Sequence, residues 1–239
     1  MDKYILSIGV DISSTDVEVD PDITEKISRE LPLILPKGVK AAISNITGDD
    51  IVITSFTPER LIEDVNRAVL HLLKKHAKGF EDLEGVSKNP EEAREGVSYA
   101  VARAGSPYGD SVILSFDTYG GEDVVDEIAL FVGDIGRKYG YDVGVSVSEE
   151  PKEIPGIGYT GRETDDPVVV VTFEDLKDLP KLSGLIFGGL LSFENLYFVR
   201  NGSPVEIVPP GVIYTMSAFL NGNVIDLYPG ITKKLKKIL

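Results

Sequence analysis

Residues 39–77, VKAAISNITGDDIVITSFTPERLIEDVNRAVLHLLKKHA, contain the pattern that decides the fold class. Val39–Ile46 and Ile51–Phe56 are rich in β-branched residues, and the polar tetrapeptide TGDD between them predicts a hairpin turn. The segment Thr57–Glu59 then marks a helix start, with Thr at the N-cap and Pro at the first helical position. Apolar residues follow at three- and four-residue spacing, so the sequence predicts an amphipathic helix over 58–77.

The order of elements in this stretch recurs along the chain. Ahead of it, Tyr4–Ile12 is an apolar, β-rich run that predicts a strand, and Asp22 can cap a helix over 23–31. Beyond it, the pattern strand, helix, strand, strand, short helix returns between residues 111 and 180. The sequence therefore predicts an α+β or α/β fold with mixed sheets, in two lobes built from candidate repeats of a β-α-β-β-α unit.

The clearest boundary between these lobes is the turn-forming segment SPYGD at 106–110. We expect an N-terminal α/β lobe over 1–105, whose last helix begins at Pro90 and ends at Gly105, and a C-terminal α/β lobe over 106–239. One continuous domain is the alternative. The last third is β-rich, with Asn-Gly turns that predict an antiparallel meander closed by a basic helix or tail. Its short β-like runs are 185–191, 195–200, 205–208, 212–219 and 224–227, and the tail is 232–239.

Composition limits the classes of function. Of the 239 residues, 42% are hydrophobic and 26% are charged, which is typical of a globular protein with a core. The net charge of −15 argues against nucleic-acid binding, because contact with a phosphate backbone needs a basic face. Without Cys there is no disulfide or thiolate chemistry. Met is scarce and Gln is absent, whereas Glu, Lys and Ile are abundant, and this composition is typical of proteins from thermophiles. No signal-peptide or membrane-spanning pattern occurs, so we expect an archaeal-like cytoplasmic protein with no membrane partner.

A metal site in this chain would take a hard cation held by oxygen ligands. His71 and His76 are five residues apart on the predicted helix, which turns them about 140° from each other and prevents a shared metal. Asp16, Glu18 and Asp20 alternate along an extended segment and could hold Mg²⁺ or Ca²⁺ on one face. A solvated strand face is the alternative interpretation of these three residues.

The segment GIGYTG at 156–161 satisfies the pattern G-x-G-x-x-G. A dinucleotide site would need a strand before it and a helix after it, and the flanking residues predict neither. The long loop 149–167 is instead a candidate binding loop, in which Arg162 could meet an anion. We take Gly156, Gly158, Thr160 and Arg162 as candidate ligand-binding residues. A surface loop without a ligand is the alternative.

Asp117 follows a predicted strand over 111–116 and precedes a predicted helix that begins at Glu122. Ligands of open α/β sheets bind at the carboxyl ends of strands, where Asp117, Thr118 and Tyr119 would lie. The acidic first turn of the helix opposes an anion, so Asp117 is predicted as an Mg²⁺ ligand or a catalytic general base. Thr118 and Tyr119 are predicted ligand contacts. The alternative is that Asp117 only caps the turn.

The segment IGVDISST at 8–15 resembles the first phosphate motif of the actin-like and sugar-kinase ATPase superfamily. The segment DTYGG at 117–121 is similar to its second phosphate motif, and Gly188-Gly189 is similar to its adenosine-contacting glycines. The resemblance implies that Asp11 and Asp117 face Mg²⁺ and that Ser13 and Ser14 lie near phosphates. The chain departs from the family pattern at Ser13, where glycine is expected.

Together these features predict a small-molecule-binding protein, with Mg²⁺ as a candidate cofactor of an enzyme that acts on a polar or phosphorylated metabolite. Its site would combine the strand ends 11–14 and 117–119 under the loop 156–162. The alternative is a non-catalytic regulatory or assembly subunit, in which Leu196, Tyr197 and Phe198 contact a partner or a second copy in a homo-oligomer.

Overall fold

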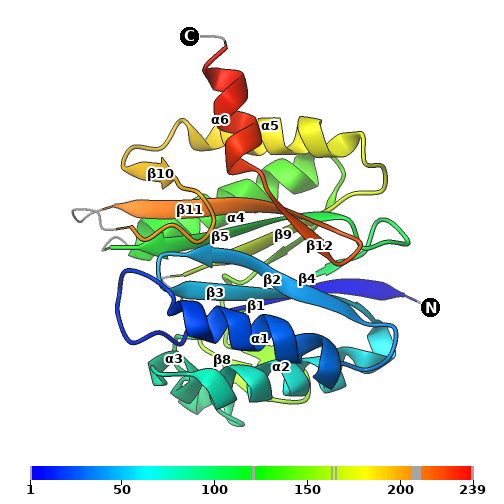
Figure 1. Cartoon of the computed structure of the whole chain (residues 1–239), viewed down its shortest axis with the longest axis vertical. Helices are drawn as coiled ribbons and strands as arrows, with labels where there is room; N and C mark the ends of the chain where they lie inside the picture. The colour runs from blue at the N-terminus through cyan, green and yellow to red at the C-terminus, as the bar shows by residue number, and fades with distance from the viewer. Residues whose placement is uncertain (1, 120–121, 163, 165, 206–210, 238–239) are drawn as a thin grey trace.

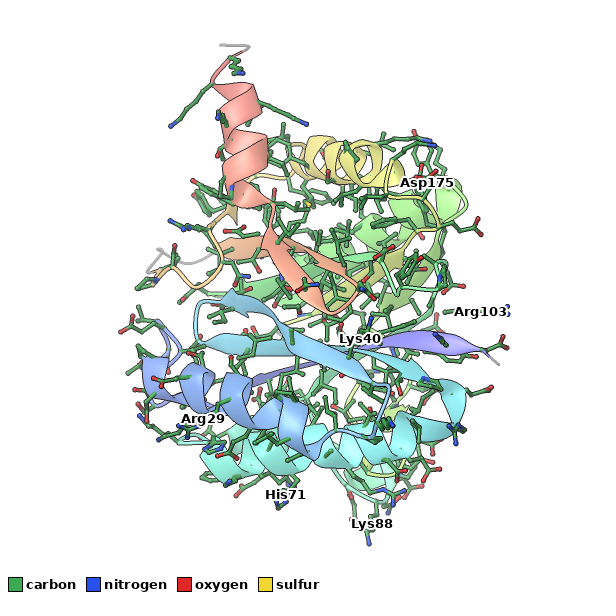
Figure 2. The ribbon with its side chains drawn as sticks, turned by 45° about the vertical axis from the view of Figure 1, so that its right-hand side comes forward. Arg29, Lys40, His71, Lys88, Arg103 and Asp175 are labelled. Carbon is green, nitrogen blue, oxygen red and sulfur yellow. The ribbon has the colours of Figure 1, made fainter. Side chains whose placement is uncertain are left out.

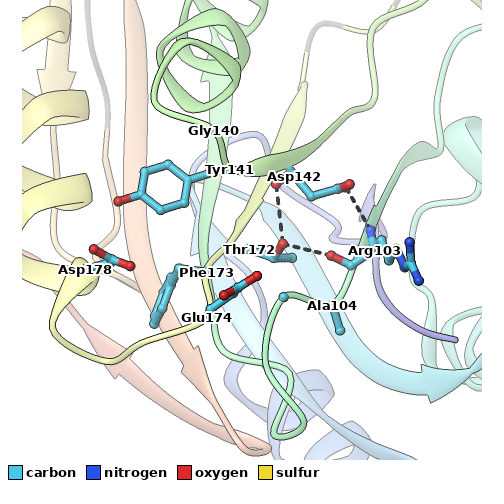
Figure 3. Close-up of a pocket in the computed structure, with 10 residues that line it drawn as sticks. Arg103, Ala104, Gly140, Tyr141, Asp142, Thr172, Phe173, Glu174 and Asp178 are labelled. Carbon is cyan, nitrogen blue, oxygen red and sulfur yellow. Dashed lines mark hydrogen bonds between the residues drawn. The ribbon is translucent and has the colours of Figure 1, made fainter.

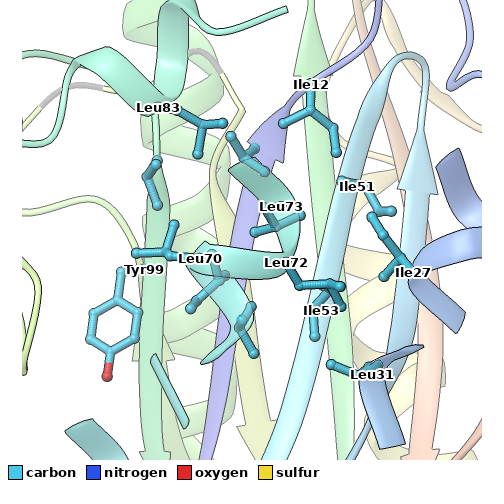
Figure 4. Close-up of a cluster of buried hydrophobic side chains, with 14 of the residues drawn as sticks. Ile12, Ile27, Leu31, Ile51, Ile53, Leu70, Leu72, Leu73, Leu83 and Tyr99 are labelled. Carbon is cyan, nitrogen blue, oxygen red and sulfur yellow. The ribbon is translucent and has the colours of Figure 1, made fainter. Parts of the chain in front are cut away.

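The predicted hairpin lies within a four-stranded antiparallel sheet. In the computed structural model, which describes residues 2–119, 122–162, 164, 166–205 and 211–237, the strands have the order β2-β3-β1-β4. They are β1 (Lys3–Asp11), β2 (Lys40–Thr47), β3 (Asp50–Pro58) and β4 (Ser98–Arg103). Helices α1 (Pro21–Ile34) and α2 (Ile62–His76) bury Ile27, Leu31 and Leu73 against one face of this sheet (Figure 4). The predicted amphipathic helix is therefore held by its apolar stripe.

A second sheet has the order β10-β11-β5-β9-β6. Its strands are β5 (Ser111–Thr118), β6 (Asp142–Val145), β9 (Val168–Thr172), β10 (Leu196–Phe198) and β11 (Val212–Leu220), with β12 (Asn223–Asp226) paired to β11. Helices α4 (Glu122–Lys138) and α5 (Asp178–Leu190) cover its outer face. Residues such as Ile128, Val132 and Ile186 are fully buried there.

Both sheets have the ferredoxin-like arrangement of a β-α-β-β-α-β unit. Within each unit the fourth strand lies beside the first, then come the third and the second, as in β4-β1-β3-β2 and β11-β5-β9-β6. The predicted α+β class with mixed sheets and a strand-rich C-terminal part is confirmed. The repetition is clear in the topology, and each repeat also includes the closing strand that the sequence pattern did not assign to it.

The two sheets pack face to face, which gives four layers with helices on the outside (Figure 1). Ile5, Val52 and Ala102 from the first sheet meet Ile113 and Val170 from the second in an apolar layer. Polar contacts cross it as well: Asn45 Nδ2 donates to Thr215 Oγ1 at 2.8 Å. This shared core ties the two halves together, while the division into lobes 1–105 and 106–239 stays a prediction.

The remaining elements are short. They are the 3₁₀ turns η1 (Glu59–Leu61) and η2 (Pro90–Glu92), helices α3 (Glu81–Glu84) and α6 (Tyr228–Leu235), and the hairpin β7 (Lys152–Ile154) with β8 (Gly158–Thr160). Figure 1 shows α6 projecting beyond α5 toward the C-terminus. Among the described residues, no helix is both long and apolar enough to cross a bilayer.

Several local predictions were wrong. The helix expected from Pro90 to Gly105 is only the turn η2, and residues 98–103 form β4 on the open edge of β1. Cross-strand pairing and the β preference of Tyr99 and Val101 outweigh the helix-start signal. Residues 185–191 belong mainly to α5, because a continuous apolar run does not distinguish a buried helix from a strand. The expected strand 205–208 lies mostly outside the described residues.

Two further corrections concern the loops and the C-terminal third. The segment 149–167 is not structureless, because it contains the hairpin β7–β8. Asp16–Asp20 is not an extended strand, and its first residues form a bend. The C-terminal third is also not a simple antiparallel meander, since β10 pairs with β11 in parallel.

Candidate metal centre

A cavity of about 730 Å³ opens where β1 and β5 end. Acidic side chains dominate its walls, and Lys78 is the one basic residue among the described residues that line it. Its lining is Asp11, Ser13, Ser14, Asp16, Asp49, Lys78, Gly79, Phe80, Glu81, Asp82, Asp117, Thr118, Tyr119 and Asp166. A concave surface of one sign concentrates counter-ions, so this cavity favours cations.

Two aspartates face each other across the first sheet beside this cavity. Asp11, the last residue of β1, is the register partner of Asp50, the first residue of β3. Side chains of directly opposed residues in an antiparallel pair lie on the same face, and like charges there are destabilising. The pairing is therefore costly for folding unless something positive lies between the two carboxylates.

The second sheet repeats this arrangement at the equivalent position. Its first and third strands, β5 and β9, pair Ser115 with Val168, and Phe116 N donates to Pro167 O at 3.1 Å. Extending this register by one more residue places Asp117 opposite Asp166. Each ferredoxin-like unit therefore brings one aspartate pair to the same end of the molecule.

Asp50 is the most deeply buried member of this group. Its residue is 2% exposed, and no described group donates a hydrogen bond to its Oδ1. Burial raises its pKa well above the ordinary value of 3.8, and the charges of Asp166 and Asp117 raise it further. A buried carboxylate normally has hydrogen-bonding or charged partners, so this oxygen marks the group as a candidate cation site.

Asp50, Asp82 and Asp166 come together closely enough to hold one metal ion. One carboxylate oxygen of each lies within 4.8 Å of those of the other two. Asp82 is supplied by the short helix α3, which is anchored by the buried Leu83. Asp82 Oδ2 also accepts a hydrogen bond from Asp11 N at 2.9 Å. A set of carboxylate oxygens is the donor set that Mg²⁺, Ca²⁺ and Mn²⁺ prefer.

Close backbone packing brings the two sheets together at this centre. Gly48, in the turn between β2 and β3, has φ of +61°, and a Cβ there would lie 1.9 Å from Asp117 Oδ2. Only a residue without a side chain lets the turn of the first sheet approach the carboxylate of the second this closely. The glycine of the TGDD turn is thus required for the aspartates to meet.

Hydroxyl groups and Lys78 complete the cavity wall. Ser13 N donates to Asp11 Oδ1 at 2.7 Å, and Ser13 Oγ donates to the carbonyl of Asp49 at 3.1 Å. Lys78 Nζ lies 2.9 Å from Asp20 Oδ1 and 3.2 Å from Asp22 Oδ1, and the hydrogen bond to Asp20 is the main cause of its raised pKa.

Tyr119 connects the cavity wall to two neighbouring segments. Its hydroxyl lies 3.1 Å from the carbonyl oxygen of Asp16 and 3.0 Å from that of Val205. Burial raises the pKa of Tyr119, and the nearby charge of Asp117 raises it further. At neutral pH Tyr119 is therefore a hydrogen-bond donor and not a base.

The structure brings part of the predicted site together. Asp11, Ser13, Ser14, Asp117, Thr118 and Tyr119 all line this cavity, although they come from opposite halves of the sequence. Asp16 lines it too, whereas Asp20 is paired with Lys78. Sequence reasoning missed Asp49, Asp50, Asp82 and Asp166. The first two were visible only as the polar end of the predicted hairpin.

The predicted loop residues lie elsewhere. Gly156 packs against Glu63 and Arg67 of α2, and Gly158 lies against Ser87. Thr160 Oγ1 donates to Val97 O at 2.7 Å, and Arg162 lines a different cavity with Arg94. None of these four is among the residues that line the acidic cavity. The expected cover by residues 156–162 is thus not formed, although Asp166, from the end of the same loop, lines the cavity.

Other candidates are also remote from the cavity. Gly188 and Gly189, the glycines of the ATPase resemblance, lie inside α5, where Gly189 packs on Phe131. His71 is exposed on α2 (Figure 2), and His76 Nε2 lies 3.2 Å from Glu30. The two histidines do not form a shared site.

A second polar cavity, of about 580 Å³, lies at the opposite ends of β4 and β9 (Figure 3). Its polar groups have partners: Arg103 N donates to Asp142 Oδ1 at 2.9 Å, and Thr172 Oγ1 donates to Arg103 O at 2.8 Å. Among the described residues that line it, none has the buried, unpartnered oxygen that distinguishes the acidic cavity.

Comparisons with known proteins identify close relatives. A family model described as "Uncharacterised conserved protein UCP005278" matches residues 4–235. The uncharacterized protein MJ1676 of Methanocaldococcus jannaschii is 64% identical over 99% of this chain and 100% of its own length. An uncharacterized protein of Methanothermobacter thermautotrophicus is 43% identical over 93% of this chain and 92% of its own. Both relatives are archaeal, in agreement with the composition.

Among solved structures, one match is TA0507, a candidate chlorite dismutase. It has a TM-score of 0.31 and 12% sequence identity, and the match covers 78% of this chain and 86% of that one.

Proposed function

The chain belongs to the UCP005278 family over residues 4–235. We propose a function for it from the acidic centre that its own fold builds. The protein binds a hard divalent cation such as Mg²⁺ through Asp50, Asp82 and Asp166. With this cation it acts as an enzyme on a small polar or phosphorylated metabolite in the adjoining cavity. The ion would polarise a substrate oxygen or activate a bound water.

One observation carries the proposal: the buried Oδ1 of Asp50 has no hydrogen-bond donor among the described residues. A solvated acidic patch would not need this arrangement, since its carboxylates could turn to water. Here the oxygen is held inside a group of like charges, at a cost to stability that a bound cation would reverse.

The substrate class follows from the charge of the cavity. Its volume of about 730 Å³ suits a metabolite-sized ligand. Mg²⁺ is usually held by few carboxylates and completes its shell with water and substrate phosphates. Because acidic side chains dominate the lining, a phosphorylated ligand would be repelled unless the cation is present. Ligand binding should therefore depend on the metal.

Residues around the centre have distinct roles in this proposal. Asp117, which is 5% exposed and lines the cavity, is the candidate general base or, alternatively, a further metal ligand. Ser13, Ser14 and Thr118 offer hydroxyls to the ligand, and Lys78 offers a positive charge.

Thermal unfolding can test this proposal. The comparison includes wild type, Asp50→Asn, and Asp64→Asn as an exposed control. Each protein is unfolded in EDTA and with Mg²⁺, Mn²⁺ or Ca²⁺. The same measurement is made with a panel of nucleotides and sugar phosphates, first without and then with the cation. A cation at about 100 times its dissociation constant adds ~2.7 kcal/mol, and it should raise the Tm of wild type and of Asp64→Asn more than the Tm of Asp50→Asn. Phosphorylated ligands should raise the Tm further only when the cation is also present. A wild type that ignores every cation, or an Asp50→Asn variant that responds equally, contradicts the proposal.

Assembly with a second copy of the chain is a second candidate function. Leu191 and Tyr197 are 66% and 47% exposed beside a cavity of about 240 Å³ with largely apolar walls. A cluster of lysines lies in and just after α6. These are Lys233, Lys234, Lys236 and Lys237. Because the whole chain has a net charge of −15, this basic cluster would complement the acidic surface of a second copy. Light scattering after size exclusion should then show a dimer that Leu191→Glu disrupts, and a concentration-independent monomer excludes it.

A further inference from the structure

The acidic centre contains more negative charge than one divalent cation can neutralise. Asp50, Asp82 and Asp166 already bring three carboxylates together. Asp11, the cross-strand partner of Asp50, and Asp117, which the extended register of β5 and β9 places opposite Asp166, line the same cavity. One ion at the first set would leave these two and Asp49 as a second negative group beside it.

The repeat relates the two groups to each other. Asp11 is the last residue of the first strand of its repeat and Asp117 is the last but one. Asp50 and Asp166 lie at the start of, or just before, the third strand. Directly opposed residues in an antiparallel pair are separated by about 4.5–5.5 Å between Cβ atoms. That spacing is close to the ~3.5–4 Å between the ions of two-metal sites.

We infer that the centre binds two divalent cations, one held by Asp50, Asp82 and Asp166 and the other by Asp11 and Asp117. Each cross-strand pair gives one carboxylate to each ion, so the duplicated fold supplies the two halves of the centre. This inference rests on the proposed cation site and adds its stoichiometry and its ligand class. The ligand is a phosphate group whose oxygens bridge both ions, since a pair of cations binds such a group more strongly than one does.

The deep position of Asp50 supports this division. Asp50 is not part of the cavity wall, whereas Asp82 and Asp166 line it together with Asp11 and Asp117. The first ion would therefore reach from the buried Asp50 to the cavity, and the second, outer ion would be held wholly by carboxylates of the wall, Asp11 and Asp117. Ser13 and Thr118, which line the cavity beside these two aspartates, are placed to contact a phosphate that reaches the outer ion.

Mn²⁺ is the probe for the test. Calorimetry should give two Mn²⁺ per chain, and electron paramagnetic resonance of the saturated protein should show an exchange-coupled pair. Asp117→Asn should lose the outer ion, leaving one Mn²⁺ with an uncoupled six-line spectrum, while Asp64→Asn should match wild type. Inorganic pyrophosphate should bind wild type at least tenfold more tightly than it binds Asp117→Asn when both are saturated with Mn²⁺.

The outcomes separate the inference from the function on which it rests. One uncoupled Mn²⁺ per wild-type chain overturns the two-ion centre and leaves the proposed cation site intact. No Mn²⁺ binding by folded wild type overturns both. Two uncoupled ions, or an Asp117→Asn variant that keeps the coupled pair, also contradict the inference. Circular dichroism of Asp117→Asn confirms that the comparison is made on folded protein.

Discussion

Asp50 on β3 lies directly opposite Asp11 on β1, with Asp50 Oδ1 buried and without a hydrogen-bond donor among the described residues. Two acidic side chains at such a position oppose folding through both desolvation and mutual repulsion. A site that keeps this arrangement loses stability when empty of cation and regains it when a cation binds. This relationship gives the first two predictions.

Asp50→Asn should stabilise the cation-free protein. The amide removes a buried charge from the neighbourhood of Asp166 and Asp117 without changing the side-chain volume. We expect the free energy of unfolding in EDTA to rise by roughly 1–3 kcal/mol, the usual scale of single buried substitutions. Chemical denaturation measures the change. Asp64→Asn on the exposed face of α2 should leave stability within about 0.5 kcal/mol, and a destabilised Asp50→Asn would contradict the prediction.

The effect of Asp50 should depend on pH. Its pKa in the folded state is raised above the ordinary value of 3.8, mainly by burial. A raised pKa means that its contribution to stability is fully present below the unfolded pKa and is lost as pH rises through the folded pKa. In EDTA, the advantage of Asp50→Asn over wild type should therefore grow from acid toward neutral pH.

Saturating Mg²⁺ should reverse that trend, because the ion favours the charged carboxylate and its binding releases protons. Calorimetry in buffers of different ionisation enthalpy measures this release. An advantage of Asp50→Asn that is constant with pH, or Mg²⁺ binding without proton release, would be the opposite result.

Gly48→Ala should impair the centre more than the fold. Its Cβ would lie 1.9 Å from Asp117 Oδ2, so the carboxylate must move away from the other aspartates. We expect a stability loss of roughly 1–3 kcal/mol and a loss of cation affinity of at least tenfold. Gly38→Ala is the matched control, because Gly38 also has a positive φ, +92°, but no atom within 4 Å of its Cβ position. Equal cation affinity in the two variants would show that the approach of Gly48 is not needed.

Lys152→Met should stabilise the protein at neutral pH. Lys152 on β7 donates from Nζ to Val145 O at 2.5 Å, and burial lowers its pKa from 10.5 to about 8. A lowered pKa means that its contribution is present above the unfolded pKa and is lost as pH falls through about 8. The gain should be roughly 1–3 kcal/mol at pH 7 and should shrink toward pH 10. The exposed Lys88→Met is the control, and a gain that grows with pH would refute the assignment.

Local patterns predicted much of the fold. The hairpin around residues 47–50 and the helix that follows it were visible because turn chemistry, capping and apolar spacing agree there. Residues 98–103 were assigned to a helix because a local start signal preceded them, whereas their conformation is decided by pairing with β1. The α5 run failed for a different reason: the helix buries one face, at Leu182, Ile186 and Leu190 among others, but glycines stand where a polar face would mark the helical period.

The candidate site was predictable only in part. Asp11 and Asp117 stand at strand ends, and this property can be inferred from sequence. Asp82 and Asp166 lie on a short helix and a loop, and they reach the centre only through the packing of α3 and the register of β9. No spacing along the chain relates these residues to Asp50. The juxtaposition of two sheet ends creates the centre, and it becomes visible only in three dimensions.

Anomalous diffraction from crystals soaked in Mn²⁺ is the most direct test of the central claim. The account predicts a strong peak bonded to carboxylate oxygens of Asp50, Asp82 and Asp166, and a second peak beside it at Asp11 and Asp117. A map without any peak at these carboxylates, in crystals that take up Mn²⁺ elsewhere, would contradict it.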